Sequence, residues 1–238
     1  VTVEVAASAV EILSPAAEVT EDFGGDLSGW TDHLGAYTLT GGKLVYASAN
    51  AGRGTIVTKA ATGDNYTIEA DVTPRGLLPG KTFGFTFRYQ DSNNNYLFVY
   101  TPGTGMRFLK RAGTGLAQNE SIPDFVMEDG RTYRFKAVVE GEHFILYVDD
   151  VKIMDVRDDA SKAPALETGP CGFYSSGMVV EYDNVSITSS VTAFPFALSG
   201  SARSGDRVAL SFAGYEDTAA LSRDGAWSYT VHYLPRGD

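Results

Sequence analysis

The segment 83–100, FGFTFRYQDSNNNYLFVY, constrains the fold more than any other part of the chain. Every second residue from Phe83 to Tyr89 is aromatic, which is the period-2 pattern of a β-strand with one buried face. The residues between them, Gly84, Thr86, Arg88 and Gln90, are expected on the opposite face. The run DSNNN predicts a tight turn, and residues 96–100 predict a second aromatic strand. The segment therefore indicates a hairpin at the centre of a β-sandwich.

The same kind of pattern recurs along the chain. About a dozen short strands are separated by turn signals every eight to twelve residues, and no window carries the apolar stripe of an amphipathic helix. Glycine occurs 26 times and aromatic residues make up 12% of the chain, as expected for strands and tight turns. These features predict an all-β fold, a two-sheet antiparallel jelly-roll sandwich.

Three regions are predicted from composition. Residues 21–188 are expected to form the sandwich, with a long polar loop at 112–130. Residues 1–20 are interpreted as a linker or an edge strand from a preceding module, or as an extra edge strand of the sandwich itself. Residues 189–238 predict a small β unit, and the sequence leaves open whether it is complete. Because the chain lacks an initiator Met and a signal peptide, it is interpreted as a piece of something longer.

Charge and cysteine content exclude several classes of function. The net charge of −11 argues against nucleic acid and anionic membrane surfaces as partners, because both would repel the chain. No apolar run approaches the length of a membrane span, so no membrane insertion is expected. The single cysteine, Cys171, cannot form an internal disulfide, and it removes cysteine-based zinc sites from consideration.

Two carboxylates carry the enzymatic hypothesis. Glu69 and Asp71 stand at i and i+2 of a predicted strand, so they share one face, as the acid–base pair of a glycoside hydrolase could. The sandwich-fold β-glucanases place a further Glu beyond such a pair, whereas here Val72, Thr73 and Pro74 follow. A solvated polar strand face is the favoured interpretation.

A structural calcium ion is the predicted cofactor. Glu21 and Asp22 precede the first dense strand and Asp183 lies in the last one, and first and last strands pair in many sandwiches. Calcium binds six to eight oxygens, so carbonyls near 41–43 could complete the site. In the alternative interpretation, Asp183 and Asn184 cap a turn.

A polar and aromatic group around the central hairpin is the predicted ligand site. Sugars are bound by aromatic faces and by charged or amide groups that pair with hydroxyls. The candidates are Arg88, Gln90, Asp91, Asn95, Tyr96, Tyr100, Arg107 and Lys110. The alternative is that Tyr96 and Tyr100 pack in the core with their hydroxyls at the rim.

The order of motifs EDFGG, LSGW, GGKLV, FGFTFRYQDSNNNYLF, GRTYRFKAVVEGEHFILYVDD and GPCGFYSSGMVVEYDNVSI carries a family resemblance. Over residues 20–188 the chain resembles the concanavalin A-like, laminin-G-like jelly rolls of bacterial carbohydrate-active enzymes, including the family 66 carbohydrate-binding modules. The tail, GDRVALSFAG to DGAWSYTVHYLPRG, resembles the β module of sialate O-acetylesterase-type carbohydrate esterases.

The resemblance implies a function. Such a domain would be a non-catalytic carbohydrate-binding module, lectin-like and often calcium-bound, in a multimodular bacterial protein that is secreted or held at the cell surface. Its partners would be a polysaccharide or oligosaccharide and a linked catalytic domain. Two alternatives remain open, namely a sandwich-class glycoside hydrolase that uses Glu69 and Asp71, and a structural spacer or adhesion module that binds no sugar.

Overall fold

The computed structural model describes residues 18–33, 37–47, 52–60, 62–189, 196–201, 208–212, 215–219 and 226–231. Its regular elements in those ranges are all β-strands, which confirms the predicted all-β class. None of the described ranges contains a helix long and apolar enough to cross a membrane.

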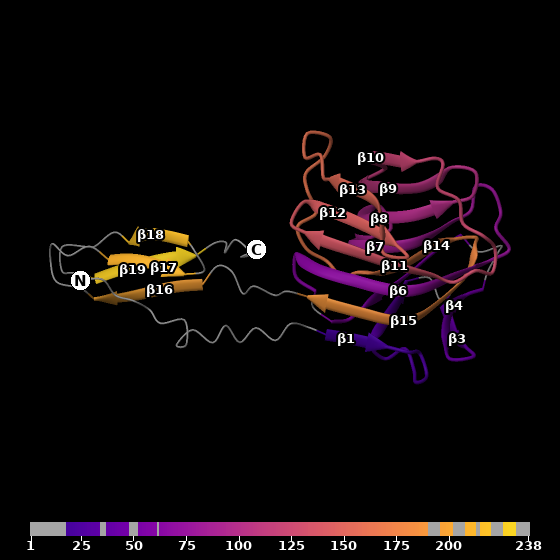
Figure 1. Ribbon diagram of the computed structural model, residues 1–238, viewed down its shortest axis with the longest axis horizontal. Helices are drawn as coiled ribbons and strands as arrows, with labels where there is room; N and C mark the ends of the chain where they lie inside the picture. Colours follow the sequence, from indigo (N-terminus) through magenta and orange to yellow (C-terminus); the bar gives the residue numbers. More distant parts are fainter. Residues whose placement is uncertain are drawn as a thin grey trace. The chain divides into compact units, whose positions relative to one another are not determined.

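Two antiparallel sheets form a sandwich (Figure 1). The eight-stranded sheet runs in the order β13-β12-β11-β6-β15-β4-β3, and β1 also pairs with β15. Its strands are β1 (Glu18–Glu21), β3 (Tyr37–Thr40), β4 (Lys43–Tyr46), β6 (Asn65–Arg75), β11 (Tyr133–Glu140), β12 (His143–Val148), β13 (Val151–Arg157) and β15 (Val179–Ser189). The seven-stranded sheet runs β10-β9-β8-β7-β14-β5-β2. Its strands are β2 (Trp30–His33), β5 (Arg53–Thr58), β7 (Thr82–Asp91), β8 (Asn94–Thr101), β9 (Gly105–Ala112), β10 (Gly115–Ile122) and β14 (Gly172–Ser176).

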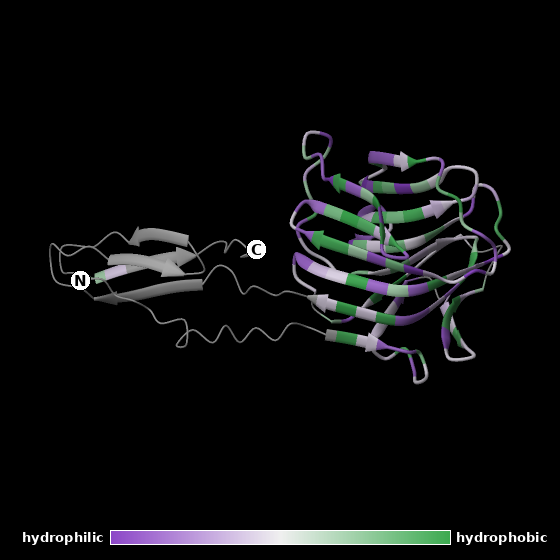
Figure 2. Ribbon diagram, in the orientation of Figure 1, coloured by the Kyte–Doolittle hydropathy of each residue, from purple (hydrophilic) through white to green (hydrophobic). Residues whose placement is uncertain are grey.

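Alternating side chains of both sheets fill the core. Green and purple bands alternate along the sandwich strands in Figure 2, as expected when one face is buried. Aromatic rings meet across the two sheets, for example Phe85 with Phe135 at 5.9 Å and Phe173 with Tyr182 at 4.2 Å between ring centroids. A hairpin joins β3 to β4, and Gly41 and Gly42 both take the positive φ that its two-residue turn requires.

The central hairpin forms as predicted, but near its turn the buried and exposed faces of β7 are exchanged. The pairing of β7 with β8 shifts register between Phe87 and Asp91, and Arg88 takes a φ of 46°. This bulge turns Arg88 inward, where it is 2% exposed and lies over the Phe144 ring, and it brings Tyr89 to the opposite face. The prediction that Tyr89 shares a face with the phenylalanines, and Arg88 the other face, is therefore wrong.

Two strand pairs bear on the predicted organisation of the sandwich, one in agreement with it and one not. The first and last strands of the sandwich pair as expected, with Glu18 opposite Thr188 and Glu21 opposite Val185. The segment 112–130 is not entirely a loop, because β10 occupies 115–122 and pairs with β9. Most β10 side chains are exposed, so the strand has no apolar alternation by which the sequence could show it.

The chain divides into two compact units, one of which spans Ala16–Val191. The other contains the short strands β16 (Phe196–Ser201), β17 (Val208–Phe212), β18 (Tyr215–Ala219) and β19 (Ala226–Val231). Within it β16 pairs with β19 and β17 pairs with β18. The predicted linker lies outside the described residues up to residue 17, whereas residues 18–20 belong to β1.

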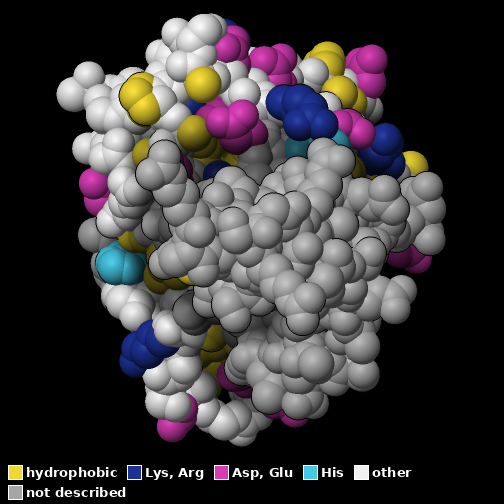
Figure 3. Space-filling model, turned by 90° about the vertical axis from the view of Figure 1, so that its left-hand side faces the viewer, with side chains coloured by type: hydrophobic (Ala, Val, Ile, Leu, Met, Phe, Trp, Pro, Cys, Tyr) yellow, Lys and Arg dark blue, Asp and Glu magenta, His cyan; other side chains and the backbone are white. Residues whose placement is uncertain are grey.

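The surface of the sandwich mixes charges of both signs. Acidic and basic side chains lie close together on the face shown in Figure 3. On the eight-stranded sheet, Glu181 accepts hydrogen bonds from both Lys43 and Arg75, and these bonds, Arg75 first, lower the pKa of the Glu181 carboxyl. Acidic surface groups of this kind are locally neutralised.

Candidate ligand site on the seven-stranded sheet

The outer face of the seven-stranded sheet carries a second apolar cluster. Leu97, Val99, Leu109 and Tyr174 pack together, separately from the main core, and form the floor of this face. They come from the adjacent strands β8 and β9 and from β14, which β7 separates from β8, with Gly84 of β7 between Val99 and Tyr174. Their positions alternate with core residues such as Phe98, Phe108 and Phe173. An apolar floor framed by long polar side chains is a common design for a small-molecule site.

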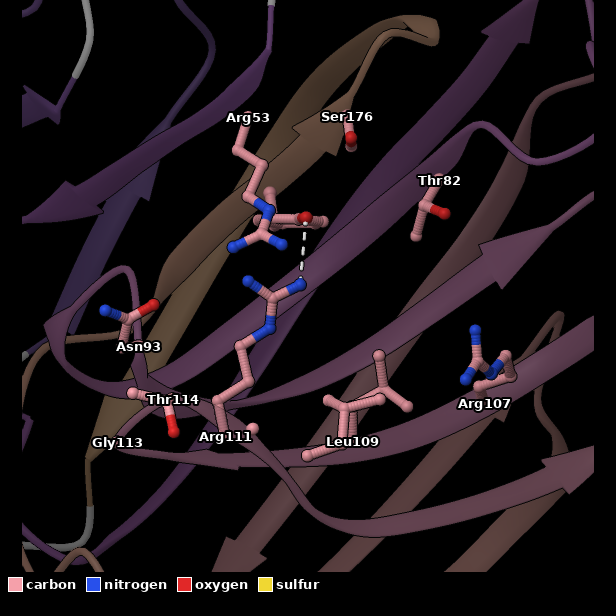
Figure 4. A pocket seen from close by; sticks show the side chains of 12 residues that line it. Arg53, Thr82, Asn93, Arg107, Leu109, Arg111, Gly113, Thr114 and Ser176 are labelled. Atoms are coloured by element: carbon pink, nitrogen blue, oxygen red, sulfur yellow. Dashed lines mark hydrogen bonds between the residues drawn. The ribbon is translucent and has the colours of Figure 1, made fainter.

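The first hollow on this face, here called the arginine pocket, has a volume of about 300 Å³. Three arginines from β5 and β9, namely Arg53, Arg107 and Arg111, stand around Leu109 (Figure 4). The other lining residues are Thr82, Asn93, Gly113, Thr114, Gly115, Leu116, Tyr174 and Ser176. No aspartate or glutamate is among these lining residues of the described structure.

Two further hollows continue the arginine pocket across the sheet. The central pocket, about 520 Å³, shares Arg53, Arg111 and Tyr174 with it. The histidine pocket, about 670 Å³, shares His33 and Tyr89 with the central pocket. Because adjacent hollows have lining residues in common, the three lie next to one another on this face and are here together called the outer groove.

The arginines differ in how firmly they are held. Arg111 donates to the backbone oxygen of Ser92 and to the Tyr174 hydroxyl, both at 3.2 Å, and its guanidinium lies over the Tyr174 ring. Arg107 donates to the side-chain oxygen of Asn119 at 3.1 and 3.3 Å. The Arg53 side chain is exposed and makes no hydrogen bond or ion pair within the described part of the chain.

The central pocket contains a buried amide with an unused acceptor. Asn95 is 3% exposed, and its Nδ2 donates to the backbone oxygen of Asp91 at 2.7 Å, but its Oδ1 has no partner. Both carboxylate oxygens of Asp91 are used, by the side-chain amide of Asn94 and the backbone N–H of Asn93. These bonds, the Asn94 side chain first, lower the pKa of Asp91. The Asn95 acceptor and the Arg111 Nε–H are thus two unpaired buried groups among the residues that line this pocket.

The eight predicted ligand residues fall into two groups. Gln90, Asp91, Asn95 and Arg107 line the outer groove. Arg88, Tyr96, Tyr100 and Lys110 are at most 2% exposed and point into the sandwich. A side chain without exposed surface cannot contact a ligand in solution, so the structure corrects the expectation for these four. For Tyr96 and Tyr100, this matches the alternative of core packing.

The inward-pointing cations belong to a buried network. Lys110 Nζ lies 2.7 Å from Asp158 Oδ1, and both side chains have no exposed surface. The Tyr96 hydroxyl donates to Asp158 Oδ2 at 2.8 Å and accepts from the Leu166 N–H at 2.9 Å. Burial, more than any other factor, raises the pKa of Tyr96. Lys110 also donates to the Ala163 carbonyl, so the network ties the 158–166 segment to the sheets.

Arg88 plays the same structural role beside this network. Its guanidinium donates to the backbone oxygen of Leu166 at 2.9 Å, of Asp64 at 3.1 Å, and of Gly141. These carbonyls belong to three separate loops, so one side chain joins them at one end of the sandwich.

The sequence-based prediction missed several charged and aromatic groove residues, namely His33, Arg53, Lys59, Tyr89, Arg111 and Tyr174. For Arg111 a signal existed, because the spacing 107, 109, 111 in GMRFLKRAG places it on the same strand face as Arg107. For His33 and Arg53 no local signal existed. They approach this face only because β5 pairs with both β2 and β14.

The carboxylates of the glycosidase hypothesis lie on the other sheet. Glu69 and Asp71 are both on β6, and Arg134 of β11 pairs with each of them at 3.1 and 3.3 Å. Lys136 also contacts Glu69, and the Asn184 amide donates to Asp71 at 2.7 Å. These residues share one strand face as predicted, but that face is a network of ion pairs away from the outer groove.

The predicted calcium ligands make local turn contacts. Glu21, Asp22 and Asp183 each accept a hydrogen bond from a nearby backbone N–H, at 2.8–2.9 Å, with one carboxylate oxygen. Such bonds are those of turn-capping side chains, as the alternative interpretation expects for Asp183. Within the described ranges no group of three or more His, Cys, Asp or Glu residues is arranged to hold a metal. A calcium ion held by these residues stays a prediction.

Comparisons with known proteins place the sandwich in a family. The model of a family described as the 3-keto-alpha-glucoside-1,2-lyase-like domain matches residues 18–188. No curated protein matches the chain significantly. Since the family match ends at residue 188, the esterase-type resemblance of the tail stays a prediction.

Solved structures share the fold. A carbohydrate-binding module of family 66 from Bacillus subtilis is 23% identical, with a TM-score of 0.57 over 69% of this chain and 98% of that one. A β-glucanase from Bacillus licheniformis is 10% identical, with a TM-score of 0.53 over 74% and 99% of the two chains. The exoplasmic/lumenal domain of VIP36, bound to Ca²⁺ and Man3GlcNAc, is 10% identical, with a TM-score of 0.53 over 72% and 87%. These likenesses confirm the predicted jelly-roll sandwich, which carbohydrate-binding modules, lectins and glycosidases share.

Proposed function

The chain belongs to the 3-keto-alpha-glucoside-1,2-lyase-like domain family, and from this premise we propose that its outer groove binds a carbohydrate. The groove offers the two kinds of contact that sugars use. Tyr89 and Tyr174 supply aromatic surface for C–H patches, and Asn95, Gln90 and the arginines supply polar groups for hydroxyls.

The observation that carries the proposal is the combination of aromatic and polar side chains along one face. The central pocket is lined by Tyr89 and Tyr174 together with Arg53, Arg111 and Asp91. Rings that pack against C–H patches and charged groups that pair with hydroxyls are the contacts that sugars use. Because the same pocket shares lining residues with the hollows on both sides, it can hold one unit of a longer oligosaccharide.

The proposed role is non-catalytic. Glycoside hydrolysis commonly uses two carboxyl groups on either side of the scissile bond. Asp91 is the one carboxylate among the described groove-lining residues, and its oxygens are engaged by Asn93 and Asn94. We therefore propose an accessory module of a secreted or surface-bound protein. It would hold a linked catalytic domain at its glycan by raising the effective concentration of substrate.

A glycan array followed by isothermal titration tests the proposal. We expect binding to at least one oligosaccharide, and we expect Tyr89→Leu to weaken it about threefold to tenfold through loss of the aromatic contact. Tyr147→Leu is the matched control, since Tyr147 lies on β12 of the other sheet and lines no part of the groove. Silence across fructans, glucans, xylans and acidic glycans would leave the spacer alternative instead.

A second candidate function is cleavage of a 3-keto-glucoside, which the family description and His33 favour. Elimination across C1 and C2 of such a sugar requires a base that removes the C2 proton next to the ketone. His33 lines both the central and the histidine pockets, and its ring packs 4.8 Å from that of Tyr89. Histidine is the most frequent side chain in this role.

Turnover of a 3-keto disaccharide tests this second candidate. If His33 is the base, His33→Asn is expected to lower kcat at least about 100-fold. His143→Asn should leave kcat unchanged, because His143 pairs with Asp155 on the other sheet. Absence of turnover by the unmodified protein would remove the enzymatic candidate and leave the binding proposal in place.

A further inference from the structure

We propose that the arginine pocket selects a sugar carrying an anionic substituent, a carboxylate or a sulfate. This inference rests on the proposed carbohydrate-binding function and specifies the chemistry of its ligand. It follows from the charges, the hydrogen bonds and the shape of that one pocket.

The charge balance of the pocket is opposite to that of the chain. The protein carries 30 acidic against 19 basic residues, yet the arginine pocket is lined by three arginines and by no acidic residue. Elsewhere on the sandwich, Arg75, Arg131 and Arg134 are each paired with carboxylates. The arginine pocket instead gathers three cations with no acidic residue among its own lining residues.

Two guanidinium groups of the pocket are directed toward one another. Figure 4 shows them to be those of Arg53 and Arg111. Two like charges in this position repel each other, and an anion between them would remove that cost. The Arg53 side chain is exposed and has no partner within the described part of the chain, so it can donate to an incoming ligand. The Nε–H of Arg111 lacks an acceptor but has almost no exposed surface, so it would reach a ligand only after that side chain shifts.

The chemistry of the donors favours a planar or tetrahedral oxyanion. Guanidinium presents its N–H groups as a fork that matches carboxylate and sulfate oxygens, and charge-assisted bonds of this kind are about twice as strong as neutral ones. The adjoining floor of Leu109 and Tyr174 supplies apolar surface for a sugar ring. The pocket volume, about 300 Å³, lies at the lower end of the range for small-molecule sites.

The test is isothermal titration with three forms of one oligosaccharide. Oligogalacturonate carries a carboxylate at C6 of each sugar, whereas its methyl ester and the neutral oligogalactose carry no charge there. A sulfated galactan is the fourth ligand, and it distinguishes a preference for sulfate from one for carboxylate. We expect one anionic form to bind at least about tenfold more tightly than the neutral forms. Arg53→Gln should remove most of that preference, because each charge-assisted bond is worth about tenfold or more.

The control is Arg157→Gln, which removes one positive charge from the protein, as Arg53→Gln does. Arg157 is exposed at the end of β13 and lines none of the three hollows, so its replacement should leave the preference intact. Equal binding of charged and neutral forms, or a preference that Arg53→Gln does not reduce, overturns the anionic inference while the carbohydrate proposal stands. Failure of all glycans to bind overturns both.

Discussion

Replacing Lys110 with methionine is expected to lower the free energy of unfolding by about 3–5 kcal/mol, because it leaves Asp158 as a buried charge without its counter-ion. Small domains are stable by only about 5–15 kcal/mol, so the loss is a large share of the total. Urea unfolding followed by tryptophan fluorescence measures it, since Trp30 lies in the core of the same sandwich.

The double variant Lys110→Met with Asp158→Leu provides the control. Removing both charges replaces the buried pair with apolar groups of similar size, which is often neutral or stabilising. Much of the lost stability should therefore return, although the Tyr96 hydroxyl then lacks its acceptor. If the single variant loses less than about 1 kcal/mol, the pair is not the buried link described here.

Arg88→Met is expected to have an effect of similar size, about 3–5 kcal/mol, and to leave glycan affinity unchanged below the melting temperature. The guanidinium satisfies the backbone oxygens of Asp64, Gly141 and Leu166, and methionine would leave these carbonyls without that donor. A thermal melt measures the loss of stability, and a glycan titration at low temperature measures the affinity separately.

Arg88→Lys sharpens this test. Lysine keeps the charge but cannot reach three separate carbonyls with a planar fork, so it should restore only part of the stability. Lost binding with an unchanged melt would instead place Arg88 in the ligand site, against its 2% exposure.

Most of the fold was predictable from the sequence because it depends on local alternation. On β6, for example, Glu69 and Asp71 were predicted on one strand face, and the residues that alternate with them, Tyr66, Ile68, Ala70 and Val72, are all buried on the other. The errors arise where a single residue breaks the period. The positive φ of Arg88 reverses the faces of β7 for its last residues, and nothing in FRYQD signals it.

The candidate site was predictable only in part, since it depends on pairing between distant strands. Gln90, Asp91, Asn95 and Arg107 were found because they surround the central hairpin itself. His33 and Arg53 arrive through β2 and β5, whose positions beside β14 follow from the overall topology. For the predicted calcium ligands, the structure adds that Glu21, Asp22 and Asp183 each accept a hydrogen bond within their own local turn, which spacing alone does not reveal.

The pairing of β1 with β15 also determines how this domain can be joined to other proteins. Glu18 and Thr188 are register partners on adjacent antiparallel strands, so the chain enters and leaves the sandwich side by side. A unit with adjacent entry and exit can be placed within a loop of a host protein without separating the host's strands. The same adjacency permits circular permutation, in which a short peptide joins the two ends and new termini open in an exposed turn such as that at Gly113.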